Sequence, residues 1–377
     1  MSNVAVAGWV PGLTDTLILK QVAAVARGPL AAAANRIDQE GYYPLDIMAR
    51  LAQAGSFAAH LDSHGQDFGA AIAATGEIAR NCGSTGFLAW CHNVCGLYME
   101  QSGNPSLRKR LDAHVAGRSF GGTALSNPMK ALAGIEPMLL RARSVPGGYR
   151  VSGSLPWVSH IAQGHYCGVI AAVERDDGTR SHEIMFLLEI DQQVELKKCP
   201  AFSGMEGTST WGIRLTDYFV GEDCLIADPA GPFVEKVRAA FILLQMGMAT
   251  GLVQASLDDM REVEPVLGHV NQFLQDRPDM LEAEFEELNG RIALLVRSPY
   301  ETDRDFLLDV LDARAQGAEL ALRATQSALL HQGARGYLLS AGPQRRIREA
   351  HFVAIVTPAI KHLRYQMNRL MQEVRPL

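Results

Sequence analysis

The stretch GGTALSNPMKALAGIEP, residues 121–137, marks the point at which helical sequence gives way to strand-like sequence. A Gly-Gly pair opens it, a short strand-like run follows, and Asn127-Pro128 then gives a strong turn signal. In residues 13–118, which precede it, apolar residues recur at three- and four-residue steps, a spacing that predicts helices. The stretch therefore predicts a strand end that offers a free backbone and the hydroxyl of Ser126 where two kinds of structure meet.

Beyond this junction the apolar period falls to two, and turns rich in Gly and Asp separate several short segments. Short strands at this spacing suggest a small barrel or sandwich. Four long amphipathic segments then complete the chain, as expected for a helical bundle. We therefore expect an α+β fold in three parts: an all-helical domain (1–118), a β-barrel domain (119–228) and a C-terminal four-helix bundle (229–377).

The composition indicates an ordinary folded protein. The chain has 377 residues, of which 47% are hydrophobic and 20% charged, and its formal charge is −6. This balance is far from that of a disordered chain, and the absence of a long basic run argues against nucleic-acid binding. Neither GxGxxG nor GxxxxGK[ST] follows a predicted strand, so the sequence does not support a Rossmann or P-loop nucleotide site.

The six cysteines indicate a reducing compartment, because they show neither CxxC spacing nor the density of a disulfide scaffold. Cys91 and Cys95 flank His92 and raise the question of zinc. No second pair of ligands follows, so buried free cysteines on a helix explain the spacing better. We therefore expect a cytoplasmic protein without a bound metal.

Two apolar stretches could be mistaken for targeting or membrane segments. The first twenty residues lack a basic region and soon reach Pro11 and Asp15, unlike a signal peptide. The run 239–257 is almost long enough to span a bilayer, but Gln245 and Gln254 contribute to a polar side. We expect it to be a helix buried in the bundle, and we expect no membrane span.

The segment YRVSGSLPWVSHIAQGHY, residues 149–166, contains a second unusual strand end. Trp157 and Ser159 alternate with Val158, so they share one face of a strand. A flat apolar ring and a hydroxyl on one face could stack against a planar heterocycle and bond its edge. The residues alone equally allow a Trp157 that fills the barrel and a Ser159 that starts a turn.

Four segments in order resemble the acyl-CoA dehydrogenase superfamily of flavoproteins over nearly the whole chain. ALSNP is similar to that family's strand ending in a hydrophobic residue, Thr or Ser, an acidic residue and Pro. GGYRVSGSLPWVS is similar to its strand with Trp-hydrophobic-Thr/Ser, and GMEGTSTWGIRLTDYFVGEDCLI to its Gly-rich strand. LLHQGARGYL followed by RRIREAHFVAIV is similar to its late Gly-rich turn and Arg-Asp-Ala helix.

The resemblance implies a flavin, FAD in the first place with FMN as an alternative, held between the β domain and the bundle. The family's flavin edge would bond the strand end at Leu125 and Ser126, and the second strand would line the ring. A tetramer or dimer is also implied, since the tail of FAD usually needs a neighbouring subunit. The implied cofactor-binding residues are Leu125, Ser126, Trp157, Val158, Ser159 and Gly333.

The sequence departs from the family at the catalytic base. A dehydrogenase removes a proton α to a thioester, and a positioned base is worth roughly 10²–10⁴ in rate. The family's Glu positions correspond here to Thr357 and, in some relatives, to Phe241, and neither side chain can take the proton. Glu349 matches a helical Asp, not the base. The catalytic residue is therefore unknown, and we expect Phe241, Gln245 and Thr357 to border the substrate pocket.

Three histidines remain as other candidates, and we expect each to have a core or surface role: His92, His351 and His362. The region that would hold the cofactor tail also departs from the family. EVEPVLGHVNQFLQDRPDM lacks the family's Arg and Phe-Gly pair and is rather acidic, which disfavours a diphosphate. Arg277 or Arg335 could substitute, and we expect weak FAD binding.

Three functions remain open at this stage. The first is α,β-dehydrogenation of an acyl-CoA or similar thioester, with possible transfer of electrons to a partner protein. The second is flavin-dependent monooxygenation, which uses reduced flavin from a partner reductase and needs no thioester base. The third is a binding or assembly subunit that kept the fold and lost catalysis.

Overall fold

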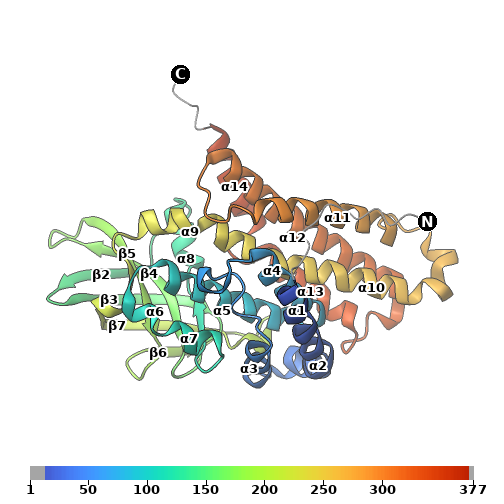
Figure 1. Cartoon of the computed structure of the whole chain (residues 1–377), viewed down its shortest axis with the longest axis horizontal. Helices are drawn as coiled ribbons and strands as arrows, with labels where there is room; N and C mark the ends of the chain where they lie inside the picture. The colour runs from blue at the N-terminus through green and yellow to red at the C-terminus, as the bar shows by residue number, and fades with distance from the viewer. Residues whose placement is uncertain (1–12, 373–377) are drawn as a thin grey trace.

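The computed structural model describes residues 13–372, and in this range helices flank a single sheet on both sides along the chain. The sheet lies at one end of an elongated molecule, and long helices extend away from it (Figure 1). The predicted α+β class and the helical–β–helical order are confirmed. The expected absence of a signal peptide rests largely on residues 1–12, which lie outside the described range.

Two of the N-terminal helices, α4 and α6, begin at a capping side chain. The side chain of Asp67 accepts the N–H of Ala70 at the start of α4, and Asn104 accepts that of Ser106 at the start of α6. Helix α5 is buried over nearly its whole length, because it lies between the sheet and the C-terminal helices. The helices are α1 (Leu13–Val25), α2 (Ala31–Glu40), α3 (Leu45–Gln53), α4 (Phe68–Asn81), α5 (Gly83–Gln101), α6 (Pro105–Arg108) and α7 (Leu111–Val115).

The sheet has eight strands, ordered β6-β7-β3-β2-β4-β5-β8, with β1 pairing β4 in parallel. A short helix, α8 (Ser126–Leu132), directly follows β1. The strands are β1 (Gly121–Thr123), β2 (Leu140–Val145), β3 (Gly148–Val158), β4 (Tyr166–Glu174), β5 (Arg180–Glu189), β6 (Glu195–Lys198), β7 (Trp211–Gly221) and β8 (Leu225–Ala227).

The predicted β-barrel is wrong in one respect, because the described sheet does not close. Strands β6 and β8 are its two edges, and neither pairs with the other. The edge strand β6 has the sequence ELKK, and charged residues commonly protect such edges from further pairing. Alternation and turns specify individual strands, whereas closure depends on pairing between distant strands, which these local patterns do not encode.

The C-terminal region is helical as predicted, but its first and last segments are each broken once. The first break falls at Gln245, between α9 and α10, and the second at 356–359, between α13 and α14. Helix α12 contacts α10, α11, α13 and α14, so it is the centre of the bundle. The helices are α9 (Ala230–Leu244), α10 (Met246–Asn271), α11 (Pro278–Leu295), α12 (Arg304–Gln332), α13 (Gly342–Ile355) and α14 (Ile360–Gln372).

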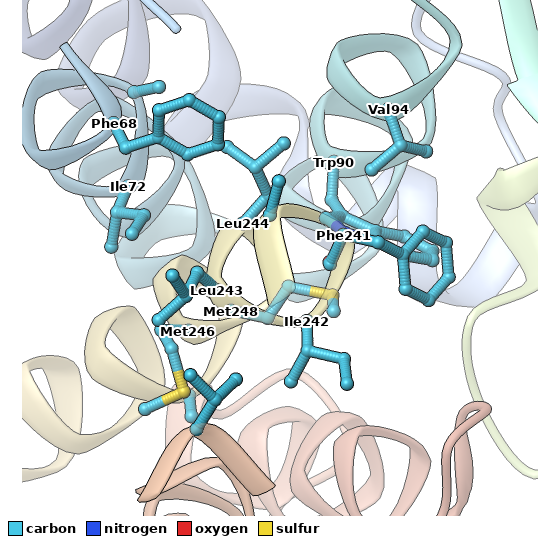
Figure 2. Close-up of a cluster of buried hydrophobic side chains, with 14 of the residues drawn as sticks. Phe68, Ile72, Trp90, Val94, Phe241, Ile242, Leu243, Leu244, Met246 and Met248 are labelled. Carbon is cyan, nitrogen blue, oxygen red and sulfur yellow. The ribbon is translucent and has the colours of Figure 1, made fainter. Parts of the chain in front are cut away.

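One hydrophobic core joins the two helical regions. Helix α10 packs against α4 as extensively as against α12. Side chains around the α9–α10 junction meet Phe68 and Ile72 of α4 on one side and Trp90 of α5 on another (Figure 2). The apolar cluster thus continues from the N-terminal helices into the bundle, while a second cluster fills the sheet.

Two described helical stretches are long and apolar enough to cross a membrane by length and composition alone, which is weak evidence for a span. The stretch Ala230–Asn271 is 94% buried in its most apolar window, as expected for a core helix of the bundle. The stretch Leu17–Glu40 is 22% buried in its window and lies near the N-terminus.

Candidate functional site

The ends of β1 and β3 lie side by side, as the sequence analysis requires. A Cβ placed on Gly122 would lie 3.2 Å from the carbonyl oxygen of Ser159, so the two backbones approach closely at a residue without a side chain. Leu125 and Ser126 follow this contact on one segment, and Trp157 precedes it on the other. The structure therefore brings the two predicted strand ends into one neighbourhood.

Trp157 and Val158 point to opposite faces of β3. Val158 is buried in the sheet core, whereas Trp157 is 61% exposed. The alternative in which Trp157 fills the barrel is therefore wrong. An exposed Trp side chain offers a flat apolar face on which a planar ligand can stack. Ile355, at the end of α13, is 69% exposed and offers a second apolar side chain to solvent.

A loop after β6 ties this end of β3 to helix α13. Cys199 approaches the carbonyl oxygen of Pro156, with its sulfur at 3.6 Å. Four residues on, the carbonyl oxygen of Ser203 accepts a hydrogen bond from Arg348 of α13 at 3.2 Å. These bonds link the end of β3 that carries Trp157 to helix α13 of the bundle, the two sides between which the sequence predicts the cofactor crevice.

Ser159 is the outer member of a chain of hydroxyl groups. Its Oγ lies 2.7 Å from that of Thr210, which lies 2.8 Å from that of Thr208, and Thr208 donates to the carbonyl oxygen of Met205 at 2.7 Å. Each hydroxyl has one proton, so this last bond fixes the direction of the others. Ser159 therefore donates its hydrogen bond to Thr210 and offers only lone pairs to a ligand, which suits a ligand with an N–H donor.

Three boundaries between secondary-structure elements meet at Ser126, Gln245 and Thr357. The hydroxyl of Ser126, at the start of α8, lies 3.0 Å from that of Thr357, between α13 and α14. Gln245, at the α9–α10 break, donates from Nε2 to the carbonyl oxygen of Thr357 at 2.9 Å. The structure thus joins Ser126, predicted to bind the cofactor, to Gln245 and Thr357, predicted to bind the substrate.

Gln245 in turn accepts a hydrogen bond from Arg314 of α12, whose Nε lies 2.9 Å from Oε1. Arg314 is fully buried, and burial lowers its pKa to about 10. The sequence analysis missed this residue. The available signal is an arginine on the apolar face of a helix, four residues after Val310 and four before Ala318, both buried.

Phe241 lies deeper and closes the apolar end of the site. Its ring meets Trp90 edge-on, with centroids 5.2 Å apart. It also lines a small cavity of about 10 Å³ together with Leu125, Met129 and Met185. None of the described residues lining this cavity is acidic. Both positions that correspond to the family's base thus border the site without a carboxylate.

Glu349 faces away from this cavity and is a structural residue. It is buried, accepts the N–H of Gly83 at the start of α5 and pairs with Arg345. Burial raises its pKa, and the attraction of Arg345 and Arg346 only partly offsets this. A carboxylate at the N-terminus of a buried helix stabilises the helix dipole, which explains its presence without catalysis.

Four buried histidines lie directly behind Ser159. His92 and His114 stack with ring centroids 3.6 Å apart, and His160 bonds the hydroxyl of Tyr43 at 2.7 Å. Burial lowers the pKa of His92 to about 3, and it lowers the pKa values of the other three as well, so all are neutral. The four are His92, His114, His160 and His165.

The remaining histidine candidates have different surroundings. His362 of α14 is buried, and burial and the nearby charge of Arg238 lower its pKa to about 4. His351 is exposed. All six cysteines are free, and among residues 13–372 no group of three or more His, Cys, Asp or Glu has an arrangement suited to a metal ion.

Gly333 lies far from the crevice within this chain. It ends α12 with φ of 60°, exposed to solvent, and stands 333 − 314 = 19 residues beyond Arg314, roughly 28 Å along the helix. Arg335 lies beside it on the surface, whereas Arg277 pairs with Asp279 at 3.0 Å. Any role of these residues toward a cofactor tail stays a prediction.

Comparisons with known proteins find similar sequences and similar folds. A family model described as the N-terminal domain of acyl-CoA dehydrogenase matches residues 14–117. The probable acyl-CoA dehydrogenase YngJ of Bacillus subtilis (strain 168) is 21% identical over 356 residues, which cover 90% of this chain and 93% of that protein.

Two solved structures share the fold. Butyryl-CoA dehydrogenase from Megasphaera elsdenii has a TM-score of 0.82 at 18% identity and covers 97% of this chain and 100% of its own. KijD3, solved in complex with FMN and a dTDP-linked amino keto sugar, has a TM-score of 0.80 at 16% identity and covers 99% of this chain and 98% of its own. At these identities both show the fold alone.

Proposed function

We propose, from the premise that this chain belongs to the acyl-CoA dehydrogenase superfamily, that it is a flavin-dependent oxidoreductase. The flavin, FAD or else FMN, is proposed to lie in the crevice between the strand ends and helix α13. When bound, it supplies reversible transfer of two electrons. The observation that carries the proposal is the exposed Trp157 beside the inward-donating hydroxyl of Ser159.

The residues present fit such a ring. Trp157 offers a flat apolar face, and Ser159 offers an acceptor for a ring N–H. On the opposite side Ser126 and Thr357 present hydroxyls, and the buried charge of Arg314 stands behind them. These groups would bind and orient the ring, and the apolar cavity at Leu125 and Phe241 would exclude water from its reactive side. The catalytic base remains unassigned.

Two reactions compete for this site. Dehydrogenation of an acyl-CoA or similar thioester is the activity named for the relatives, and an electron-transfer partner would then reoxidise the flavin. Monooxygenation with reduced flavin from a partner reductase is favoured by one specific observation, since Phe241 and Thr357 occupy both base positions. KijD3, with its sugar-nucleotide ligand, is one protein of this fold whose ligand is not an acyl thioester. A non-catalytic subunit is the third candidate.

We also propose a homotetramer or dimer in the cytoplasm. Large apolar side chains that a monomer would leave in water gather on the far helices. Phe273, after α10, is 83% exposed, and Tyr337 and Leu339, after α12, are also exposed. A second copy of the chain covering this face would bring Gly333 and Arg335 close to a neighbouring crevice or its cofactor tail.

Colour tests the proposal directly. Protein purified or reconstituted with FAD should show the visible absorption of an oxidised flavin, and a colourless protein that ignores both FAD and FMN would favour the non-catalytic subunit. The flavin-loaded protein is then mixed with a panel of acyl-CoA thioesters without oxygen. Bleaching by a thioester indicates dehydrogenation, whereas bleaching only by a reductase system indicates monooxygenation.

A further inference from the structure

The guanidinium of Arg314, bonded to Gln245, is a buried charge that the proposed flavin site leaves unexplained. Its side chain is buried, and among residues 13–372 no carboxylate forms an ion pair with it. Nε donates to Gln245 and Nη2 donates to the carbonyl oxygen of Val353 at 2.7 Å, whereas Nη1 has no partner. Both partners are neutral groups, but the Val353 carbonyl belongs to the last turn of α13, so the negative end of that helix dipole offsets part of the charge.

Such a charge is expensive for the folded state. Burial of an isolated ion costs several kcal/mol even after relaxation of the protein, and apolar residues of similar volume avoid this cost. Among the described residues Arg345 is the other buried arginine and pairs with Glu349, and the half-buried Arg348 pairs with Asp38. Arg314 therefore fits a role in binding better than a role in stability.

Two hydrogen bonds connect Arg314 to Thr357 through Gln245. Arg314 holds Oε1 of Gln245, which forces the amide nitrogen of Gln245 toward the carbonyl oxygen of Thr357. Thr357 meets Ser126 at the rim. A charge in a poorly hydrated interior acts on neighbouring charges more strongly than the same charge in water, because few water molecules screen it.

We propose that Arg314 is a positioning residue that orients Gln245 and Thr357, and that its unpaired charge makes the crevice prefer a negatively charged occupant over a neutral one of the same shape. The inference rests on the proposed function, and a flavin offers both forms. The oxidised ring is neutral, whereas the two-electron reduced ring loses a proton from its pyrimidine edge near neutral pH and becomes an anion.

The experiment compares the dissociation constants of oxidised and reduced FMN, measured without oxygen, in the whole protein and in Gln245→Glu. The wild type should bind reduced FMN at least tenfold more tightly. In Gln245→Glu a carboxylate of nearly the same shape pairs with Arg314, so this preference should fall at least tenfold. A preference within twofold of the wild type would overturn the inference while leaving flavin binding, and thus the proposed function, intact.

A second pair of variants separates the charge of the residue 314 side chain from its shape. The pair also tests the inference if Gln245→Glu does not fold. Arg314→Lys should keep the preference within about threefold, and Arg314→Met should lose at least tenfold; equal losses in both would overturn the inference. Arg323→Met, on the exposed side of the same helix, is the matched control and should change neither constant. A wild type that binds no flavin in either form would overturn the proposed function and this inference together.

Discussion

Two regions beside the crevice bury polar side chains without counter-ions, and they meet the cost in opposite ways. Behind Ser159, the histidines around His92 give up their protons, and burial holds their pKa values far below neutrality. Behind Thr357, Arg314 keeps its proton, because even a pKa lowered to about 10 leaves it charged at neutral pH. An imidazole can lose its charge near neutral pH, whereas a guanidinium cannot, so the surroundings of Arg314 or a ligand must offset its charge.

Acid should have the largest effect, because it protonates the buried histidines and so lowers the free energy of unfolding. Each of the four folded-state pKa values lies below the unfolded value of 6.5, so the unfolded chain binds more protons below pH 6.5, and for His92 this holds down to about pH 3. Stability is fully present above pH 6.5 and falls below it, by roughly 1.4 kcal/mol per pH unit for each histidine that stays neutral. Urea unfolding at pH 7.5, 6.5 and 5.5 measures the slope, and a free energy of unfolding that is flat over this range would contradict it.

Removal of a paired charge should have the next largest effect on the free energy of unfolding, and it gives a reference for the unpaired Arg314. Arg348 forms two hydrogen bonds to the carboxylate of Asp38, at 2.7 and 2.6 Å, and joins α13 to α2. Arg348→Met leaves Asp38 buried and unpaired, which should cost about 3–5 kcal/mol of unfolding free energy. Urea denaturation measures the loss. The exposed Arg323→Met should cost less than about 1 kcal/mol, and an equal loss in both variants would refute the distinction between the two sites.

Flavin retention sharpens the comparison at the crevice itself. Trp157→Ala removes a stacking face, which for bases stacked on aromatic rings is worth about 1–3 kcal/mol. Ser126→Ala removes a hydroxyl at the rim and should weaken binding less, by about 0.5–1.5 kcal/mol. Ser154→Ala, on the same strand as Trp157 and exposed, is the control. The flavin-to-protein ratio after dialysis measures the effect, and equal ratios in all three variants would remove the ring from this position.

The smallest expected effect comes from adding a carboxylate at the family's base position. Thr357→Glu places an anion two hydrogen bonds from the unpaired guanidinium, so we expect the unfolding free energy to change by less than about 1 kcal/mol. If the pocket accepts thioesters, the variant should bleach its flavin with an acyl-CoA under anaerobic conditions. A folded, flavin-loaded variant that no thioester bleaches would favour monooxygenation.

The sequence predicts local features of this molecule well. Apolar periodicity places the helices and strands, and the alternation of Trp157, Val158 and Ser159 correctly gives one exposed and one buried face. It predicts the meeting of two strand ends only through the family resemblance, because the contact at Gly122 joins segments that are distant along the chain.

Features that depend on long-range packing could not be read from the sequence. Closure of the sheet depends on whether β6 meets β8, which no local pattern encodes. The sequence places Arg314 on the apolar face of its helix, but its hydrogen bonds to Gln245 and Val353 depend on segments distant along the chain. Gly333 sits in a recognisable turn, but a helix of known length carries that turn away from the crevice of its own chain.

The core that runs without interruption from α4 through α10 to α12 has a practical consequence. A fragment that ends near residue 118 would uncover the flank of α4 that packs on α10 and the flanks of α5 that pack on β1 and the bundle, and such a fragment should aggregate rather than fold. Heating the intact chain should accordingly give a single calorimetric peak that spans both helical regions, since melting of either region exposes shared core side chains of the other.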